Sequence, residues 1–246
     1  MTAPVFVVEH FRAGGGGQYV LDGPEGRHAV SVKRLRPGET VVLTDGKGRW
    51  SDCDVVGTEG KDRLIVHMTS VSEEPPESPR ITVVQALPKG DRGELAVETM
   101  TETGVDAIVP WAAARCITQW KGERGLKALA KWRSTAREAG KQSRRVRFPE
   151  VADAASTKQV AALLAEADFA AVLHESGDEP LATVELPSSG EIVLVVGPEG
   201  GVAPEELALF EEAGAQAYRL GPTVLRTSTA GTAAAALLLG RSGRWS

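Results

Sequence analysis

Gly197-Pro198-Glu199-Gly200-Gly201 and Leu220-Gly221-Pro222-Thr223-Val224-Leu225-Arg226-Thr227-Ser228-Thr229-Ala230 are the two stretches that decide the fold of this chain. Each follows a strand-like run, Ile192 to Val196 and Ala217 to Leu220, and each precedes a helix-like stretch. Successive strand–loop–helix units place their loops at one edge of a parallel sheet, where small ligands bind. The two stretches therefore predict a ligand site built from backbone-rich loops.

Strand and helix patterns also alternate upstream of these loops. The strand-like segments are 81–87, 107–110 and 169–173, and the helix-like segments are 94–103, 127–142 and two that begin near Pro204 and Thr232. Leu129, Trp132 and Ala136 share one face of the helix at 127–142. This alternation predicts an α/β fold with a mostly parallel sheet that helices cover on both faces.

The N-terminal part of the chain has a different sequence pattern. Short alternating stretches at 4–9, 40–44 and 64–68 are separated by glycine turns, which is typical of a small β-barrel or sandwich. Acidic and proline-rich residues follow from Ser70 to Pro79. We therefore predict three parts: a β-barrel over 1–72, a linker over 73–79 and the α/β domain over 80–246.

The composition bounds the class of protein. With 42% hydrophobic residues the chain can form a substantial core, and its longest apolar run, Ala233 to Leu239, is too short to span a membrane. That run is apolar all round, so we expect it inside the core or against another subunit. Two cysteines and the absence of signal-peptide features at the start predict a cytoplasmic protein. The four histidines are scattered, so we expect no metal.

The charge is segregated along the chain. Between Arg115 and Arg147 there are eleven lysines and arginines against Glu123 and Glu138, although the whole chain carries a net charge of −5. Such a segment is either a solvated helix face or a footprint for a polyanion. The cluster Arg144-Arg145-Val146-Arg147 is too concentrated for pairing within a helix, which favours contact with phosphates.

The two glycine-rich loops differ in how specific they are. Gly23-Pro24-Glu25-Gly26 repeats the first loop's tetrapeptide outside a strand–helix frame, so the first loop taken alone could be an ordinary turn. The second loop places Arg226, a fixed planar cation, between the apolar pair Val224 and Leu225 and three hydroxyl residues. Those hydroxyls, Thr227 to Thr229, could cap the following helix or contact a ligand.

Seven patches in order resemble the RsmE family of 16S ribosomal RNA (uracil-N3) methyltransferases, within the SPOUT superfamily. They are Leu87-Pro88-Lys89-Gly90, Glu102-Thr103-Gly104-Val105 before Ile108-Val109-Pro110, Arg115, Gln142-Ser143 with Arg145, Leu173-His174-Glu175, and the two glycine loops. In the first domain, His28-Ala29-Val30 leading to Arg34 through Glu39 is similar to the family's PUA-like RNA-binding barrel. The resemblance covers nearly the whole chain.

The resemblance implies a SPOUT-type sheet with a C-terminal trefoil knot and a homodimer with the site close to the partner. It also implies that S-adenosylmethionine, in a bent form, methylates N3 of a uridine near the decoding centre of 16S rRNA in the small ribosomal subunit. The main alternative is a non-catalytic RNA-binding or ribosome-assembly protein that retains the pocket. A nucleotide-binding oxidoreductase or hydrolase is a second alternative, but the chain has no G-x-G-x-x-G, G-x-x-x-x-G-K-[S/T] or G-x-S-x-G motif.

The resemblance also assigns site residues. The expected cofactor-binding residues are Leu173, His174, Glu175, Val196, Gly197, Pro198, Glu199, Gly200, Gly201, Leu220, Gly221, Val224, Leu225, Thr227, Thr229 and Ala230. Arg226 is the expected catalytic residue, His174 is expected to form pocket wall, and the expected RNA-binding residues are Arg34, Arg36, Lys89, Arg115, Arg144 and Arg145. One position departs from the family: Ser228 stands where its arginine–threonine–glutamate–threonine run has the glutamate, which puts a general base at that position in doubt.

Overall fold

The computed structural model describes residues 3–11 and 16–245 of the chain. These residues form two compact units. The first comprises Met1–Pro76 together with Gly140–Phe148, and the second comprises Glu77–Ala139 together with Pro149–Ser246. The segment 140–148 therefore belongs to the N-terminal unit, which the sequence pattern did not predict.

The first unit is built on a six-stranded sheet. Its strands are β1 (Val5–Val7), β2 (Gly17–Leu21), β3 (Thr40–Thr44), β4 (Arg49–Glu59), β5 (Arg63–Met68) and β6 (Ser72–Glu73). The order is β1-β3-β4-β5-β2 with β6 on β4, and β1 pairs with β3 in parallel whereas the other pairs are antiparallel. Every second residue of β4 is buried from Ser51 to Val55, as expected for a strand with one face on a core.

Helix α1 (Gly23–Arg27), with the π-helical turn η1 (His28–Val32) after it, explains the repeated tetrapeptide. Glu25 accepts a hydrogen bond from the backbone N–H of Val7 at 3.3 Å and pairs with the ammonium of Lys141 at 2.9 Å. Both charged side chains are largely buried. The tetrapeptide at 23–26 therefore serves an internal ion pair, and it does not form a second ligand loop.

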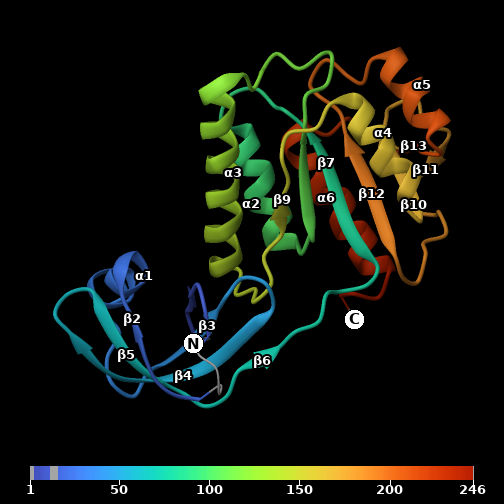
Figure 1. The fold of residues 1–246 in the computed structure, drawn as a ribbon. Helices are drawn as coiled ribbons and strands as arrows, with labels where there is room; N and C mark the ends of the chain where they lie inside the picture. The colour runs from blue at the N-terminus through green and yellow to red at the C-terminus, as the bar shows by residue number, and fades with distance from the viewer. Residues whose placement is uncertain (1–2, 12–15, 246) are drawn as a thin grey trace. The chain divides into compact units, whose positions relative to one another are not determined.

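The second unit contains a seven-stranded sheet in which every pair is parallel (Figure 1). Its order is β11-β13-β10-β12-β7-β8-β9. The strands are β7 (Arg80–Ala86), β8 (Ala107–Trp111), β9 (Glu150–Val151), β10 (Phe169–Leu173), β11 (Glu179–Pro180), β12 (Glu191–Val196) and β13 (Gln216–Arg219). β8 is buried along its whole length and β7 and β12 beyond their first residues, as in a sheet with both faces covered.

Five helices accompany this sheet: α2 (Arg92–Thr103), α3 (Gly122–Gln142), α4 (Thr157–Glu166), α5 (Pro204–Glu212) and α6 (Thr227–Arg241). α2 packs beside α6, which lies along β7 and β12, while α4 packs beside α5 and next to β10 (Figure 1). The α/β architecture with a parallel sheet is confirmed. The predicted start of the last helix near Thr232 is wrong, because the hydroxyl residues Thr227 to Thr229 already form its first turn.

Candidate functional site

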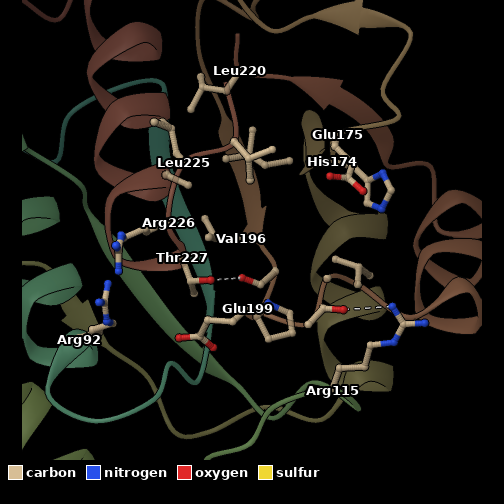
Figure 2. A pocket seen from close by; sticks show the side chains of 18 of the residues that line it. Arg92, Arg115, His174, Glu175, Val196, Glu199, Leu220, Leu225, Arg226 and Thr227 are labelled. Carbon is tan, nitrogen blue, oxygen red and sulfur yellow. Dashed lines mark hydrogen bonds between the residues drawn. The ribbon is translucent and has the colours of Figure 1, made fainter. Parts of the chain in front are cut away.

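A cavity of about 1070 Å³ lies where the loops after β7, β8, β10, β12 and β13 meet (Figure 2). The carboxyl ends of these parallel strands share one edge of the sheet, which is where the topology predicts a ligand site. Residues from all five loops line the cavity, and all of them belong to the second unit. One compact unit thus builds the whole site.

The loop after β12 is held in place by hydrogen bonds from three other segments. The backbone N–H of Lys89 donates to Glu199 Oε1 at 3.1 Å, and Arg115 Nη1 donates to the carbonyl of Gly200 at 3.1 Å. Thr227 Oγ1 donates to the carbonyl of Gly197, also at 3.1 Å. Figure 2 shows the last two bonds as dashed lines at opposite ends of the loop. The glycine loop is therefore a preformed part of the cavity wall.

The loop after β13 is exposed instead. Residues 221–226 all lie on the surface, and the side chain of Val224 is 81% exposed although it lines the cavity. Arg226 is the residue before α6 and forms no side-chain cap there, and Thr227 uses its hydroxyl on Gly197. Of the two readings of these hydroxyls, capping is therefore not seen for Thr227, whose hydroxyl joins the two loops.

The segment after β10 forms a third part of the wall. The backbone N–H of His174 donates to the carbonyl of Tyr218 on β13 at 3.0 Å, and its Nδ1 lies 2.6 Å from Ser176 Oγ. Figure 2 shows His174 and Glu175 together, away from Arg92 and Arg226. The imidazole is thus held by its neighbour at one end of the cavity.

The expected cofactor residues converge on this cavity with one exception. Thr229 does not line it, because it is exposed on the first turn of α6 and its hydroxyl donates to the carbonyl of Arg226 at 3.2 Å. Ser228, at the position that departs from the family, is only 2% exposed and does not line the cavity either. The first turn of α6 therefore directs both side chains away from the cavity.

The expected RNA-binding residues fall into two groups. Lys89 and Arg115 line the cavity, whereas Arg34, Arg36, Arg144 and Arg145 belong to the first unit. Arg34 and Arg144 have φ values of 57° and 64°, a left-handed conformation that is uncommon for residues other than glycine. Both are exposed. These two exposed arginines are thus displayed on unusual backbone turns.

Sequence reasoning missed five cavity residues, Gly90, Arg92, Ile117, Val202 and Arg219, and it included Pro222 and Thr223 only as part of the loop at 220–230. A signal existed for Arg92, because the expected strand at 81–87 belongs to the same sheet and its loop must reach the same edge. Arg92 is the first residue of α2. It therefore adds a second arginine to the side of the cavity that holds Arg226.

A buried carboxylate supports the site from behind. Glu206 on α5 is 5% exposed and accepts hydrogen bonds from the backbone N–H of Ala114 at 2.8 Å and from Thr157 Oγ1 at 2.9 Å. Its other oxygen accepts from the backbone N–H of Ala203 at 3.2 Å. Because Ala114 precedes Arg115, Glu206 fixes the segment whose guanidinium holds the loop after β12.

Other chemistries find little support near the cavity. Cys116 is buried, and this burial raises the pKa of its thiol, so the reactive thiolate is disfavoured. Burial also raises the pKa of Cys53 to about 11.

Within residues 3–11 and 16–245, no three His, Cys, Asp or Glu side chains gather closely enough to hold a metal ion. In the same residues, no helix combines the length and hydrophobicity of a membrane-spanning segment.

Comparison with protein families and relatives agrees with this architecture. Residues 76–239 match an RNA methyltransferase domain, and residues 21–68 match an RNA methyltransferase PUA domain. Ribosomal RNA small subunit methyltransferase E of Mycobacterium bovis is 47% identical over 230 residues, which cover 92% of this chain and 87% of the relative. The enzyme of that name from Bacillus subtilis is 28% identical over 86% of both chains.

A solved structure is similar over almost the whole chain. The crystal structure of ribosomal RNA small subunit methyltransferase E from Neisseria gonorrhoeae bound to S-adenosyl methionine superposes with a TM-score of 0.85. The two chains are 30% identical, and the match covers 98% of each. The chain therefore belongs to the family of ribosomal RNA small subunit methyltransferase E, the RNA methyltransferases that its sequence motifs resemble.

Proposed function

We propose that this protein transfers a methyl group from S-adenosylmethionine to N3 of a uridine in 16S rRNA. The observation that carries the proposal is the single cavity that the loops after β10, β12 and β13 line together. A relative of the same architecture was solved with S-adenosyl methionine bound. The family identity and the geometry of the loops therefore support the same reaction.

The lining of the cavity suits this cofactor. Leu173, Val196, Leu220 and Leu225 offer apolar surface, while the glycine loops offer backbone polar groups. Nothing lies within 4 Å of the place where a Cβ on Gly221 would stand, so the protein's own packing does not require glycine there. A glycine that packing does not require is consistent with the close approach of a ligand. We assign the expected cofactor residues to this role, except Thr229.

When bound, S-adenosylmethionine supplies a methyl group on a positively charged sulfur that is an excellent leaving group. The protein's task is then to align the attacking nitrogen and to favour loss of the N3 proton. Arg226 is the proposed catalytic residue, because its exposed guanidinium lines the cavity beside the cofactor loops. Ser228 is buried, so it does not receive that proton.

RNA binding involves both units in this proposal. A uridine inside folded RNA has to be unstacked before N3 is exposed, and basic side chains then hold the backbone around it. In the first unit, Arg34, Arg36, Arg144 and Arg145 are the proposed phosphate contacts. The left-handed conformations of Arg34 and Arg144 support this role, since strained backbone persists most often at functional positions.

The assembly and setting follow from the same proposal. We propose that the protein is a homodimer and that the loops of the cavity form a C-terminal trefoil knot. We also propose that it acts in the cytoplasm, on the small ribosomal subunit near the decoding centre. Val224, which lines the cavity but is 81% exposed, also offers apolar surface to a partner subunit. Light scattering at micromolar concentration would contradict the dimer if it gave the mass of one chain.

The direct test has two parts. Calorimetry with S-adenosylmethionine should detect one site per chain, and mass mapping should find one methylated uridine in 16S rRNA after incubation with small subunits that lack it. Cofactor binding without methylation would favour a non-catalytic RNA-binding protein. The burial of Ser228 weakens that alternative, because the serine is not among the residues that line the cavity.

A further inference from the structure

Two arginines face each other at one side of the cavity. Arg92 begins α2 and Arg226 directly precedes α6, and Figure 2 shows their guanidinium groups pointing toward one another. Within the described part of the chain, neither side chain makes a hydrogen bond or an ion pair. The other arginines of the cavity are committed, since Arg115 donates to Gly200 O and Arg219 donates to Asp178 O at 3.0 Å.

This arrangement is electrostatically unfavourable in the free protein. Like charges repel, and the N-terminal end of a helix is itself positive, so a basic side chain there adds to the repulsion. Neither Asp91 nor Arg226, the residues that precede α2 and α6, caps its helix with a side-chain hydrogen bond. An anion placed between the two guanidinium groups would remove this cost.

We propose that Arg92 and Arg226 together hold one phosphate of the RNA backbone next to the target uridine. The inference rests on the proposed function and adds Arg92 to it as a positioning residue. A phosphate carries a permanent charge and several acceptor oxygens, which suit two forked guanidinium groups. A uracil ring is negative only while it reacts, so it does not balance two permanent positive charges in the ground state.

The two arginines are expected to differ in what their loss affects. Arg226 lies in the loop that also contacts the cofactor space, whereas Arg92 reaches the same point from α2 on the other side. Loss of Arg92 should therefore weaken RNA binding and leave the chemical step intact. Loss of Arg226 should affect both binding and turnover.

The experiment compares R92A, R92K, R226A and the double variant with the wild type and with K158A. Lys158 is an exposed residue of α4 outside the cavity, so K158A removes the same charge from the same unit. RNA affinity is measured over a range of salt concentrations on unmethylated small subunits, cofactor affinity by calorimetry, and kcat and KM by methyl transfer.

For R92A we expect an RNA Kd and KM about tenfold higher, as for loss of one charged hydrogen bond. Its kcat and its affinity for S-adenosylmethionine should stay within about twofold of the wild-type values. K158A should stay within about twofold of wild type in all of these measurements. R92K should recover part of the affinity. Because both arginines serve one phosphate, the double variant should lower the salt slope by about 0.7, the value for one contact in a single strand.

Three results would overturn the inference. If R92A bound RNA as tightly as K158A at every salt concentration, Arg92 would touch no phosphate. A loss of cofactor affinity in R92A would assign the pair to the carboxylate of S-adenosylmethionine. A fall in kcat with unchanged RNA binding would assign Arg92 to the uracil ring. A wild type that binds but does not methylate the subunits would refute the proposed function, and the RNA affinities would still decide the phosphate site.

Discussion

The loops after β12 and after β13 line the same cavity but are built in opposite ways. The first, Gly197 to Gly201, is fixed by hydrogen bonds from Lys89, Arg115 and Thr227. The second, residues 221–225, is exposed and makes no hydrogen bond to other residues that the structure describes. One wall is thus completed by folding alone, whereas the other keeps polar and apolar groups open for a ligand or a partner.

Stability and function therefore depend on different walls of this site. Changes in the anchored loop should reduce the free energy of unfolding, because they break contacts within the protein. Changes in the exposed loop should leave that free energy almost unchanged and act on cofactor, RNA or turnover. The four predictions that follow test this separation.

The largest effect is expected in the exposed loop. Arg226→Ala should lower the rate of methyl transfer by at least about 100-fold, a magnitude typical of a misplaced reactant, because the phosphate next to the target uridine is no longer held. Its thermal stability and its affinity for S-adenosylmethionine should match the wild type, because the guanidinium has no partner among the described residues. Turnover within a few-fold of wild type would show that Arg226 has no catalytic role.

Loss of a residue that supports the anchored loop should lower the free energy of unfolding. Glu206→Ala removes the buried acceptor of three hydrogen bonds behind Arg115 and should lower the free energy of unfolding by about 3 kcal/mol, because buried donors lose their partner. Denaturant unfolding measures this change. Lys158→Ala, at an exposed site on α4, is the control, and an equally small loss in both variants would contradict the proposed anchoring.

A pair of glycine variants compares the loops directly. A Cβ on Gly197 would stand 2.8 Å from Val202 Cγ2, so Gly197→Ala should cost about 1–3 kcal/mol of stability through overpacking. A Cβ on Gly221 meets no atom within 4 Å, so Gly221→Ala should change stability by less than about 0.5 kcal/mol. Calorimetry should show a loss of cofactor affinity in Gly221→Ala although its stability is unchanged, whereas any loss in Gly197→Ala should come together with lower stability. Equal stability losses would mean that the loops do not differ as described.

The smallest effect is expected at the most exposed apolar residue. Val224→Ser should leave the free energy of unfolding within about 0.5 kcal/mol of wild type, since the side chain is already 81% exposed. If the residue contacts a partner subunit, the same variant should weaken the dimer, which light scattering over a dilution series would measure. A marked loss of stability at a concentration where the protein is monomeric would contradict the description of this loop.

Much of this comparison could be predicted from the sequence. The glycines and the strand-like runs before them predict both loops, because strand periodicity and turn chemistry are local properties. Family membership was also predicted from the motifs and is confirmed by the relatives. The residues assigned to the cofactor remain a proposal, although all but Thr229 line the cavity.

The parts that were missed depend on contacts between distant segments. Glu25 binds Lys141, and Thr44 Oγ1 donates to the carbonyl of Val146 at 2.7 Å, so the basic segment after 139 packs with the N-terminal unit. No local sequence pattern predicts such contacts between distant segments. The burial of Ser228 was also missed, since threonine and serine favour caps and turns and the start of α6 was expected five residues too late.

Hydrogen exchange with and without S-adenosylmethionine measures directly whether the two loops form a cofactor site with one fixed and one open wall. In the free protein, the amide of Gly201, which donates to the carbonyl of Pro198 at 2.9 Å, should exchange more slowly than the amides of residues 221–225. On binding, strong protection should appear at 221–225, with little change at 197–201. Unchanged exchange in both loops at saturating cofactor would show that they do not form the cofactor site.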